Sequence, residues 1–116
     1  MVEKIATYET RKTIIIGQES YYLALPCIVK GTADTVVKAG EPLVGALNDR
    51  DAGFTAGTSG AVGMNLHEVK LDANGKGNGT IVIRGCVDEL KLDAAVATRL
   101  ETAAIDGIVV VKGSAF

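Results

Sequence analysis

The stretch of residues 60–93 constrains the fold more than any other part of the chain. Apolar and polar residues alternate over residues 62–66, a polar segment with several glycines follows at residues 72–79, and a dense apolar run, TIVIRGCV, fills residues 80–87. Alternation with a period of two is typical of a strand with one buried face, and a polar glycine-containing segment between two such runs favours a hairpin. The stretch therefore predicts a β-hairpin that leads into a helix.

The alternation breaks at His67 and Glu68, because Val69 and Leu71 continue the apolar series at odd-numbered positions. A β-bulge inserts one extra residue into a strand and would restore a single apolar face. We therefore expect a bulge here. His67 is the only histidine in the chain, and without a second histidine or a paired cysteine we interpret it as a structural or surface residue.

Other apolar runs predict further strands. They lie at residues 13–16, 21–30, 35–38, 43–47 and 108–112. Pro26 interrupts the second of these runs, and because proline cannot donate to a ladder, that strand bends, ends there or lies at a sheet edge.

Apolar residues recur at helical spacing from Leu92 to Ala104, which predicts one short helix. Asp88 or Asp93 is suited to cap its N-terminus. Gly107 lies just beyond its end, where a left-handed capping residue is expected.

The length and composition favour a single β-rich domain. A chain of 116 residues is near the usual size of one domain, and 14 glycines with only three tyrosines, two phenylalanines and no tryptophan indicate short strands joined by turns. We expect a mainly β (α+β) fold, a small β-barrel or β-tulip-like domain over residues 13–116, with one short helix near the C-terminus. Residues 1–12 are expected to form an N-terminal arm.

Charge and hydropathy argue against several partners. The net charge is −2 with mixed signs, no basic stripe is present, and no apolar run reaches the roughly 20 residues of a membrane-spanning helix. We therefore expect neither nucleic acid nor a membrane as a partner. The charged N-terminus does not resemble a signal peptide, so synthesis in the cytoplasm is expected.

No motif in the sequence indicates catalysis, a metal or a cofactor. Residues 72–79 begin like a calcium loop, but Lys76 occupies a ligand position and Ile83 stands where the bidentate glutamate is required. Asp49 and Asp51 flank Arg50 and are interpreted as solvated turn charges. We expect a protein that is not an enzyme. Cys27 and Cys86 have no metal-ligand spacing and are expected to be reduced, buried thiols.

Two features of the sequence leave alternatives open. Phe54 is the one large apolar residue in the loop of residues 48–59, so it either packs onto the core or inserts into a neighbouring subunit. The run at residues 80–87 is apolar on both faces, so it lies either between two layers or against another subunit. Phe54, Ile81, Ile83 and Val87 are therefore candidate subunit-interface residues.

Residues 1–12 are polar, with Val2, Ile5 and Tyr8 at irregular spacing. This pattern fits either a frayed terminus or a strand that docks onto a partner. A second open question concerns residues 37–43, VKAGEPL, a sequence that also occurs in biotinyl and lipoyl carrier domains. A non-enzymatic carrier or small-molecule-binding β-barrel is therefore an alternative function.

Several segments in order resemble the head decoration proteins of tailed phages, the family that includes the decoration protein of phage lambda. They are AGEPLVGAL at residues 39–47, SGAVGMNL at 59–66, NGTIVIRGCVDELKLD at 78–93 and IDGIVVV at 105–111. The similarity covers about the last two-thirds of the chain and rests on glycines and strand patterns. The apolar segment of residues 13–29 departs from the family pattern.

The resemblance implies a role in a virion. Family members assemble as homotrimers on the exterior of the icosahedral capsid, at three-fold and quasi-three-fold sites, and reinforce the expanded shell. The N-terminal arm binds the major capsid protein by adding a strand to its sheet. In this chain the corresponding arm residues are Val2, Glu3, Lys4, Ile5, Ala6, Thr7 and Tyr8.

Overall fold

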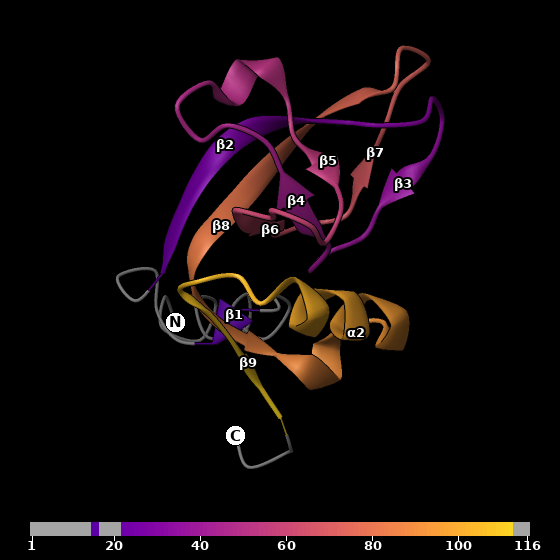
Figure 1. Cartoon of the computed structure of the whole chain (residues 1–116). Helices are drawn as coiled ribbons and strands as arrows, with labels where there is room; N and C mark the ends of the chain where they lie inside the picture. The colour runs from indigo at the N-terminus through magenta and orange to yellow at the C-terminus, as the bar shows by residue number, and fades with distance from the viewer. Residues whose placement is uncertain (1–14, 17–21, 113–116) are drawn as a thin grey trace, which may run out of the picture.

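The computed structural model describes residues 15–16 and 22–112, and these form a mainly β domain with one α-helix near the C-terminus (Figure 1). The strands are β1 (Ile15–Ile16), β2 (Leu23–Lys30), β3 (Val36–Val37), β4 (Pro42–Val44), β5 (Thr55–Ala56), β6 (Gly63–Asn65), β7 (Val69–Lys70), β8 (Lys76–Asp88) and β9 (Ile108–Val111). The helix α2 spans Ala94–Ala103, and two short 3-10 helices, η2 (Arg50–Ala52) and η3 (Glu89–Lys91), lie in the connections. The expected fold class is confirmed in these terms.

The strand β8 organises the main sheet, because it has a partner on each side in both of its halves. Its first half pairs antiparallel with β2 and β6, and its second half pairs antiparallel with β1 and parallel with β9. This arrangement buries Ile81, Val82 and Val87 completely. It also explains why residues 80–87 are apolar on both faces.

The remaining strands extend the sheet from β6. The order continues through β4 to β5, while β3 and β7 form a separate two-stranded sheet. The sheet is not closed into the expected barrel. The contact between β2 and the segment before β5 is an isolated parallel bridge between Val29 and Phe54, in place of a continuous ladder.

The break in alternation at residues 67–68 has a different cause from the expected bulge. The strand β6 ends at Asn65 and pairs with β8, whereas β7 begins at Val69 and pairs with β3. The chain therefore leaves one sheet and enters another, and each strand keeps its own apolar side. Met64, Leu66, Val69 and Leu71 are all buried.

The polar connection after β7 is shorter than predicted, because β8 already begins at Lys76. Its tight turn is built by the Asp72 carboxylate, which accepts from the backbone N–H groups of Asn74 and Lys76 at 2.8 and 3.0 Å. Gly75 has a φ of +74°, and a Cβ at this position would lie 2.2 Å from the carbonyl oxygen of Gly31. Glycine is therefore required at this turn.

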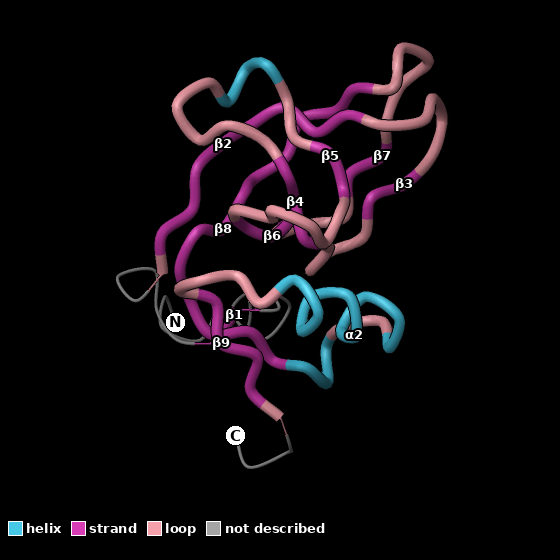
Figure 2. Tube along the Cα trace, viewed as in Figure 1, coloured by secondary structure: helices cyan, strands magenta, loops and turns pink. Residues whose placement is uncertain are grey.

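Two hydrophobic clusters form the core. One gathers Met64, Val82 and Val87 with Leu100 of the helix, and the other gathers Leu43, Phe54 and Ile81 with neighbours from β2, β3 and β7. Figure 2 shows the helix at one end of the main sheet, beside the end of the chain that carries β9. The helix α2 thus packs against the inner face of the sheet, where Leu100 meets Val82 and Val87 of β8.

Both aspartates proposed as helix caps act as caps, but of different helices. The Asp93 carboxylate accepts from the Ala95 N–H at 3.0 Å and begins α2, and the Asp88 carboxylate accepts from the Leu90 N–H at 3.0 Å and begins η3. The helix ends at Ala104, which adopts the left-handed conformation with a φ of 49°. The prediction of Gly107 as the capping residue was therefore wrong by one short turn.

Candidate interaction surfaces

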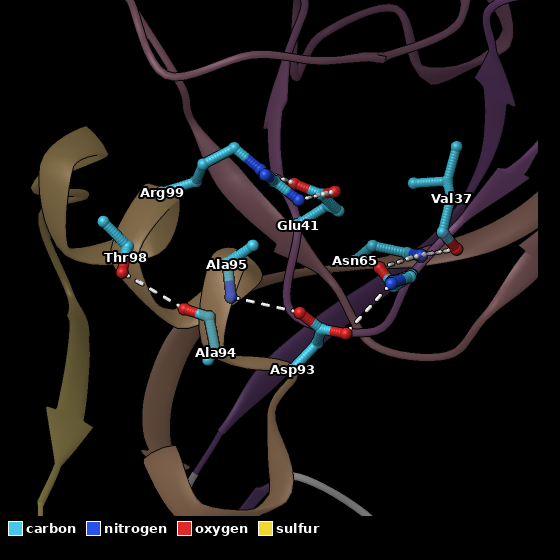
Figure 3. Close-up of polar contacts among 9 residues, drawn as sticks. Val37, Glu41, Asn65, Asp93, Ala94, Ala95, Thr98 and Arg99 are labelled. Carbon is cyan, nitrogen blue, oxygen red and sulfur yellow. Dashed lines mark hydrogen bonds and ion pairs between the residues drawn. The ribbon is translucent and has the colours of Figure 1, made fainter.

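A set of polar side chains fastens α2 to the corner before β4, and we call it the polar clamp (Figure 3). Arg99 donates to both carboxylate oxygens of Glu41, at 2.9 and 2.6 Å. At the N-terminal end of the helix, the Lys38 ammonium contacts the carboxylate of the capping residue Asp93 at 3.0 Å. The Glu41 side chain is only 13% exposed, so the Arg99 pair is partly shielded from water, whereas the Lys38 pair lies at the surface. The clamp holds the helix against the corner formed by the AGEP sequence at residues 39–42.

Asn65 completes the polar clamp from inside the core. Its side-chain amide donates to the carbonyl oxygens of Val37 and Lys38, at 3.2 and 3.1 Å, and its backbone bonds Gly40 and Glu41. The residue is 0% exposed, and its side-chain oxygen has no hydrogen-bond partner among the described residues. Asn65 therefore fixes the path of residues 37–41 from the core side, while α2 contacts the same segment through Lys38 and Glu41.

The charges of the polar clamp are matched to one another. The hydrogen bond from Lys38 holds the pKa of Asp93 below its ordinary value, with a further contribution from the Ala95 N–H. The hydrogen bond to Glu41 raises the pKa of Arg99. Asp93 and Arg99 are thus each stabilised in the charged form by a partner, which suits a structural clamp rather than a proton-transferring site.

A second surface lies on the sheet face turned away from α2. Leu23 is paired with Arg84, and Val109 is paired with Cys86. Because Arg84 and Cys86 occupy alternate positions of β8, these four side chains share one face. Leu23 and Val109 are 49% and 56% exposed. We call these four residues the outer face.

Other exposed apolar side chains are scattered over the domain. Leu90 in η3 is 62% exposed, Val36 in β3 is 47% exposed and Leu47 lies in the loop after β4. Singly exposed apolar residues are ordinary on protein surfaces, so these three do not define a site by themselves.

Three of the four predicted interface residues lie inside the chain's own core. Phe54, Ile81 and Val87 are each 0% exposed, and only Ile83 is half-buried. The Phe54 ring packs so close to Gly45 that a Cβ there would lie 2.5 Å from it. In this fold these three side chains are enclosed by the chain's own core and have no exposed surface.

The predicted arm residues 2–8 lie outside the described residues, as does most of the arm's expected junction with the domain. The described part begins with β1, in which Ile15 is paired with Val87 and Ile16 with Cys86. The run at residues 13–16 thus contains a strand of the domain.

The residues considered for chemistry are placed as structural or surface groups. Arg50 donates to the Pro26 carbonyl at 2.7 Å, so it supports the loop, and His67 is exposed. Cys27 and Cys86 are both free, and burial raises the pKa of the Cys27 thiol. Across residues 22–112, no group of three or more histidine, cysteine or acidic side chains is placed to hold a metal ion.

The sequence reasoning missed the exposure of β9 and the pairing of charges across the polar clamp. The run IVVV at residues 108–111 predicts a strand but does not indicate which of its side chains are exposed, and Val109 is 56% exposed. The clamp joins residues 58 positions apart in sequence, Glu41 and Arg99. Periodicity carries no signal for either feature.

Comparison with known proteins assigns no family. No family model and no curated protein sequence matches the chain. Among the described residues, no helix is long and apolar enough to cross a membrane.

Proposed function

We propose that this chain is a capsid decoration protein that binds as a homotrimer to the outside of an icosahedral phage head and reinforces the expanded shell. The main support is the order of segments that resemble the family, from AGEPLVGAL at residues 39–47 to IDGIVVV at 105–111. In this role the partner is the major capsid protein, the site is the capsid exterior of the virion, and no catalysis is needed.

The placement of the resembling segments fits a rigid body of this kind. AGEPL forms the corner gripped by the polar clamp, and the segment of residues 78–93 forms most of β8 together with η3 and the cap of α2. These segments therefore build the framework of the domain, whereas the outer face leaves Leu23 and Val109 exposed. A framework protein with apolar side chains left at its surface is suited to binding neighbours.

The arm hypothesis is tested by deleting residues 1–12. The truncated protein is expected to keep the circular dichroism spectrum of the full chain and to lose cosedimentation with expanded phage heads. A chain in which residues 1–12 are replaced by a glycine–serine linker of equal length is the matched control, and it should also fail to bind. Full binding by the truncated protein would refute the arm, and failure of the full chain to bind any expanded head would refute the proposed function.

The carrier alternative makes a different prediction about covalent structure. A biotinyl or lipoyl carrier from its native source would show an added mass on a lysine, whereas a decoration protein is expected to show the mass of the unmodified 12.0 kDa chain. Intact-mass spectrometry of the native protein separates the two.

A further inference from the structure

The strand β9 is an edge of the sheet among the described residues. It pairs with β8 along one side and with no other described strand. Its four residues, IVVV, contain no charge and no proline, and its pairing with β8 runs from Gly85 to Asp88 without a register shift. Proteins usually protect an edge strand with charges, prolines or bulges, because an open edge is a template for another strand. This edge has none of these protections.

The direction of its backbone groups follows from one hydrogen bond. The N–H of Gly85 donates to the carbonyl of Gly107 at 2.9 Å, and Gly85 is paired with Ile108. In a parallel ladder, alternate residues direct their backbone groups to the same side. Val109 and Val111 therefore bond β8, and the backbone groups of Ile108, Val110 and Lys112 point to the open edge.

The outward groups are ready for a further strand. The N–H of Ile108 bonds the carbonyl of Ile105 at 3.2 Å. The carbonyl of Ile108, both backbone groups of Val110 and the N–H of Lys112 have no backbone partner among the described residues. These groups alternate as a strand partner requires.

We propose that the edge of β9 joins two copies of this chain, with the two β9 strands antiparallel and Val110 facing Val110 of the second copy on a two-fold axis. In this register each Val110 N–H donates to the Val110 carbonyl of the other copy, and each Lys112 N–H donates to the Ile108 carbonyl of the other copy. The outward groups are then bonded except for the Lys112 carbonyl, because the N–H of Ile108 keeps its own bond to Ile105.

The side chains are complementary in the same register. On the outer face, the exposed Val109 of each copy meets Val111 of the other, so apolar side chains cover one another. On the opposite face, Lys112 lies across from Ile108. Asp106 lies in the turn that precedes β9, so the antiparallel arrangement brings the Lys112 end of one strand toward the Asp106 end of the other. No like charges are opposed.

Lys112 remains able to make this contact although it already binds Glu101 at 2.8 Å, because its side chain is 62% exposed and an ammonium has three donors. The charge pattern therefore favours a second copy over an unrelated strand, since Asp106 and Lys112 flank the apolar run with opposite signs. The pairing goes beyond the proposed function, because it requires no capsid and adds a two-fold contact to any three-fold assembly.

The test compares masses measured by size exclusion with light scattering. Val110→Pro removes the outward N–H and keeps the ladder to β8, which uses Val109 and Val111, and proline is tolerated at such edge positions. It also changes the Val110 side chain, which packs against the core, so Val109→Lys serves as a second, independent variant. If the units are monomers, the wild type is expected to have twice the mass of Val110→Pro. If the units are trimers, each with three such edges, the wild type is expected to have at least twice that mass. Val109→Lys, which puts a charge against Val111 of the second copy, should give the same mass as Val110→Pro.

Val36→Lys is the matched control, because Val36 is an exposed valine on the separate sheet of β3 and β7. It should keep the wild-type mass. Circular dichroism establishes that each variant is folded, and Val109→Lys answers the question if Val110→Pro does not fold. Equal masses for the wild type and the folded variants would overturn the proposal. The same result is expected if residues 1–14 of the same chain cover the edge in place of a second copy. Capsid cosedimentation is a separate readout, so either proposal can fail alone.

Discussion

Replacing Asn65 by aspartate is expected to make the folding stability strongly dependent on pH. The side chain of Asn65 is fully buried, and its amide donates to the carbonyl oxygens of Val37 and Lys38 at 3.2 and 3.1 Å. In Asn65→Asp a carboxylate would face these two oxygens with no donor between them. The folded protein must therefore hold the new carboxyl in its protonated form, which raises its pKa.

The magnitude follows from the size of such shifts. Full burial raises a carboxyl pKa by up to about 3–5 units, from an unfolded value of about 3.9. Below the unfolded pKa the carboxyl is protonated in both states and this penalty is absent. Above it, stability falls by about 1.4 kcal/mol per pH unit until the folded pKa is reached, which gives a loss of about 4 kcal/mol at pH 7. A domain has only about 5–15 kcal/mol in total.

Urea unfolding followed by far-ultraviolet circular dichroism measures this loss at about pH 4 and pH 7, each relative to the wild type at the same pH. Asn78→Asp is the matched control, because this substitution makes the same chemical change at an exposed position of β8. It should show little difference between the two pH values. If Asn65→Asp loses the same free energy of unfolding at both pH values, the carboxylate is solvated in the folded state and the side chain at position 65 is not enclosed.

Two further predictions concern turns and surface charges. Gly60→Ala is expected to lower the free energy of unfolding by about 1–2 kcal/mol, because Gly60 has a φ of +77° with open space around it. Gly75→Ala should lower it clearly more, because its Cβ would also meet the Gly31 carbonyl. Urea unfolding compares the two variants, and equal losses would contradict the steric argument. Hydrogen bonds from the Lys76 and Asn74 N–H groups lower the pKa of Asp72, so its contribution is present above the unfolded value of about 3.9 and is lost as the pH falls through the folded pKa. Asp72→Asn should therefore flatten the acid limb of stability below about pH 4, and an unchanged acid limb would contradict this.

Strand positions could be predicted from the sequence because burial imposes a pattern on each strand. The runs at residues 35–38, 80–87 and 108–112 contain or lie within β3, β8 and β9. The helix α2 was predicted in the same way, since Val96 and Leu100 pack inward and Asp93 caps it. These features depend on neighbours in the sequence, which a pattern records.

Pairing partners could not be predicted in this way. The predicted hairpin is present where β6 pairs antiparallel with β8. The sequence did not indicate that β2 pairs with β8 along most of its first half or that β7 pairs with β3. The pairing with β2 places the Val29 side chain over Gly79, where a Cβ would lie 2.6 Å from it. Such long-range contacts leave no periodic trace.

The sequence could not separate core residues from candidate interface residues, for a related reason. A core and a subunit interface are both rich in apolar residues, so composition alone cannot distinguish them. Phe54, Ile81 and Val87 looked suitable for an interface but are buried within the chain, whereas Val109 on the outer face is 56% exposed. Whether an apolar side chain is exposed depends on what packs against its face of the sheet, which only the structure supplies.

The position of β8 late in the chain has a consequence for synthesis on the ribosome. A nascent chain that ends before Lys76 lacks the partner of β1, β2 and β6, and retains only the ladders β3–β7, β4–β5 and β4–β6. Leu23 and Arg84, or Lys30 and Lys76, meet only after this strand has been made. Pairings between distant segments slow folding. The domain is therefore expected to acquire its structure late, in one step, when the last third of the chain has left the ribosome.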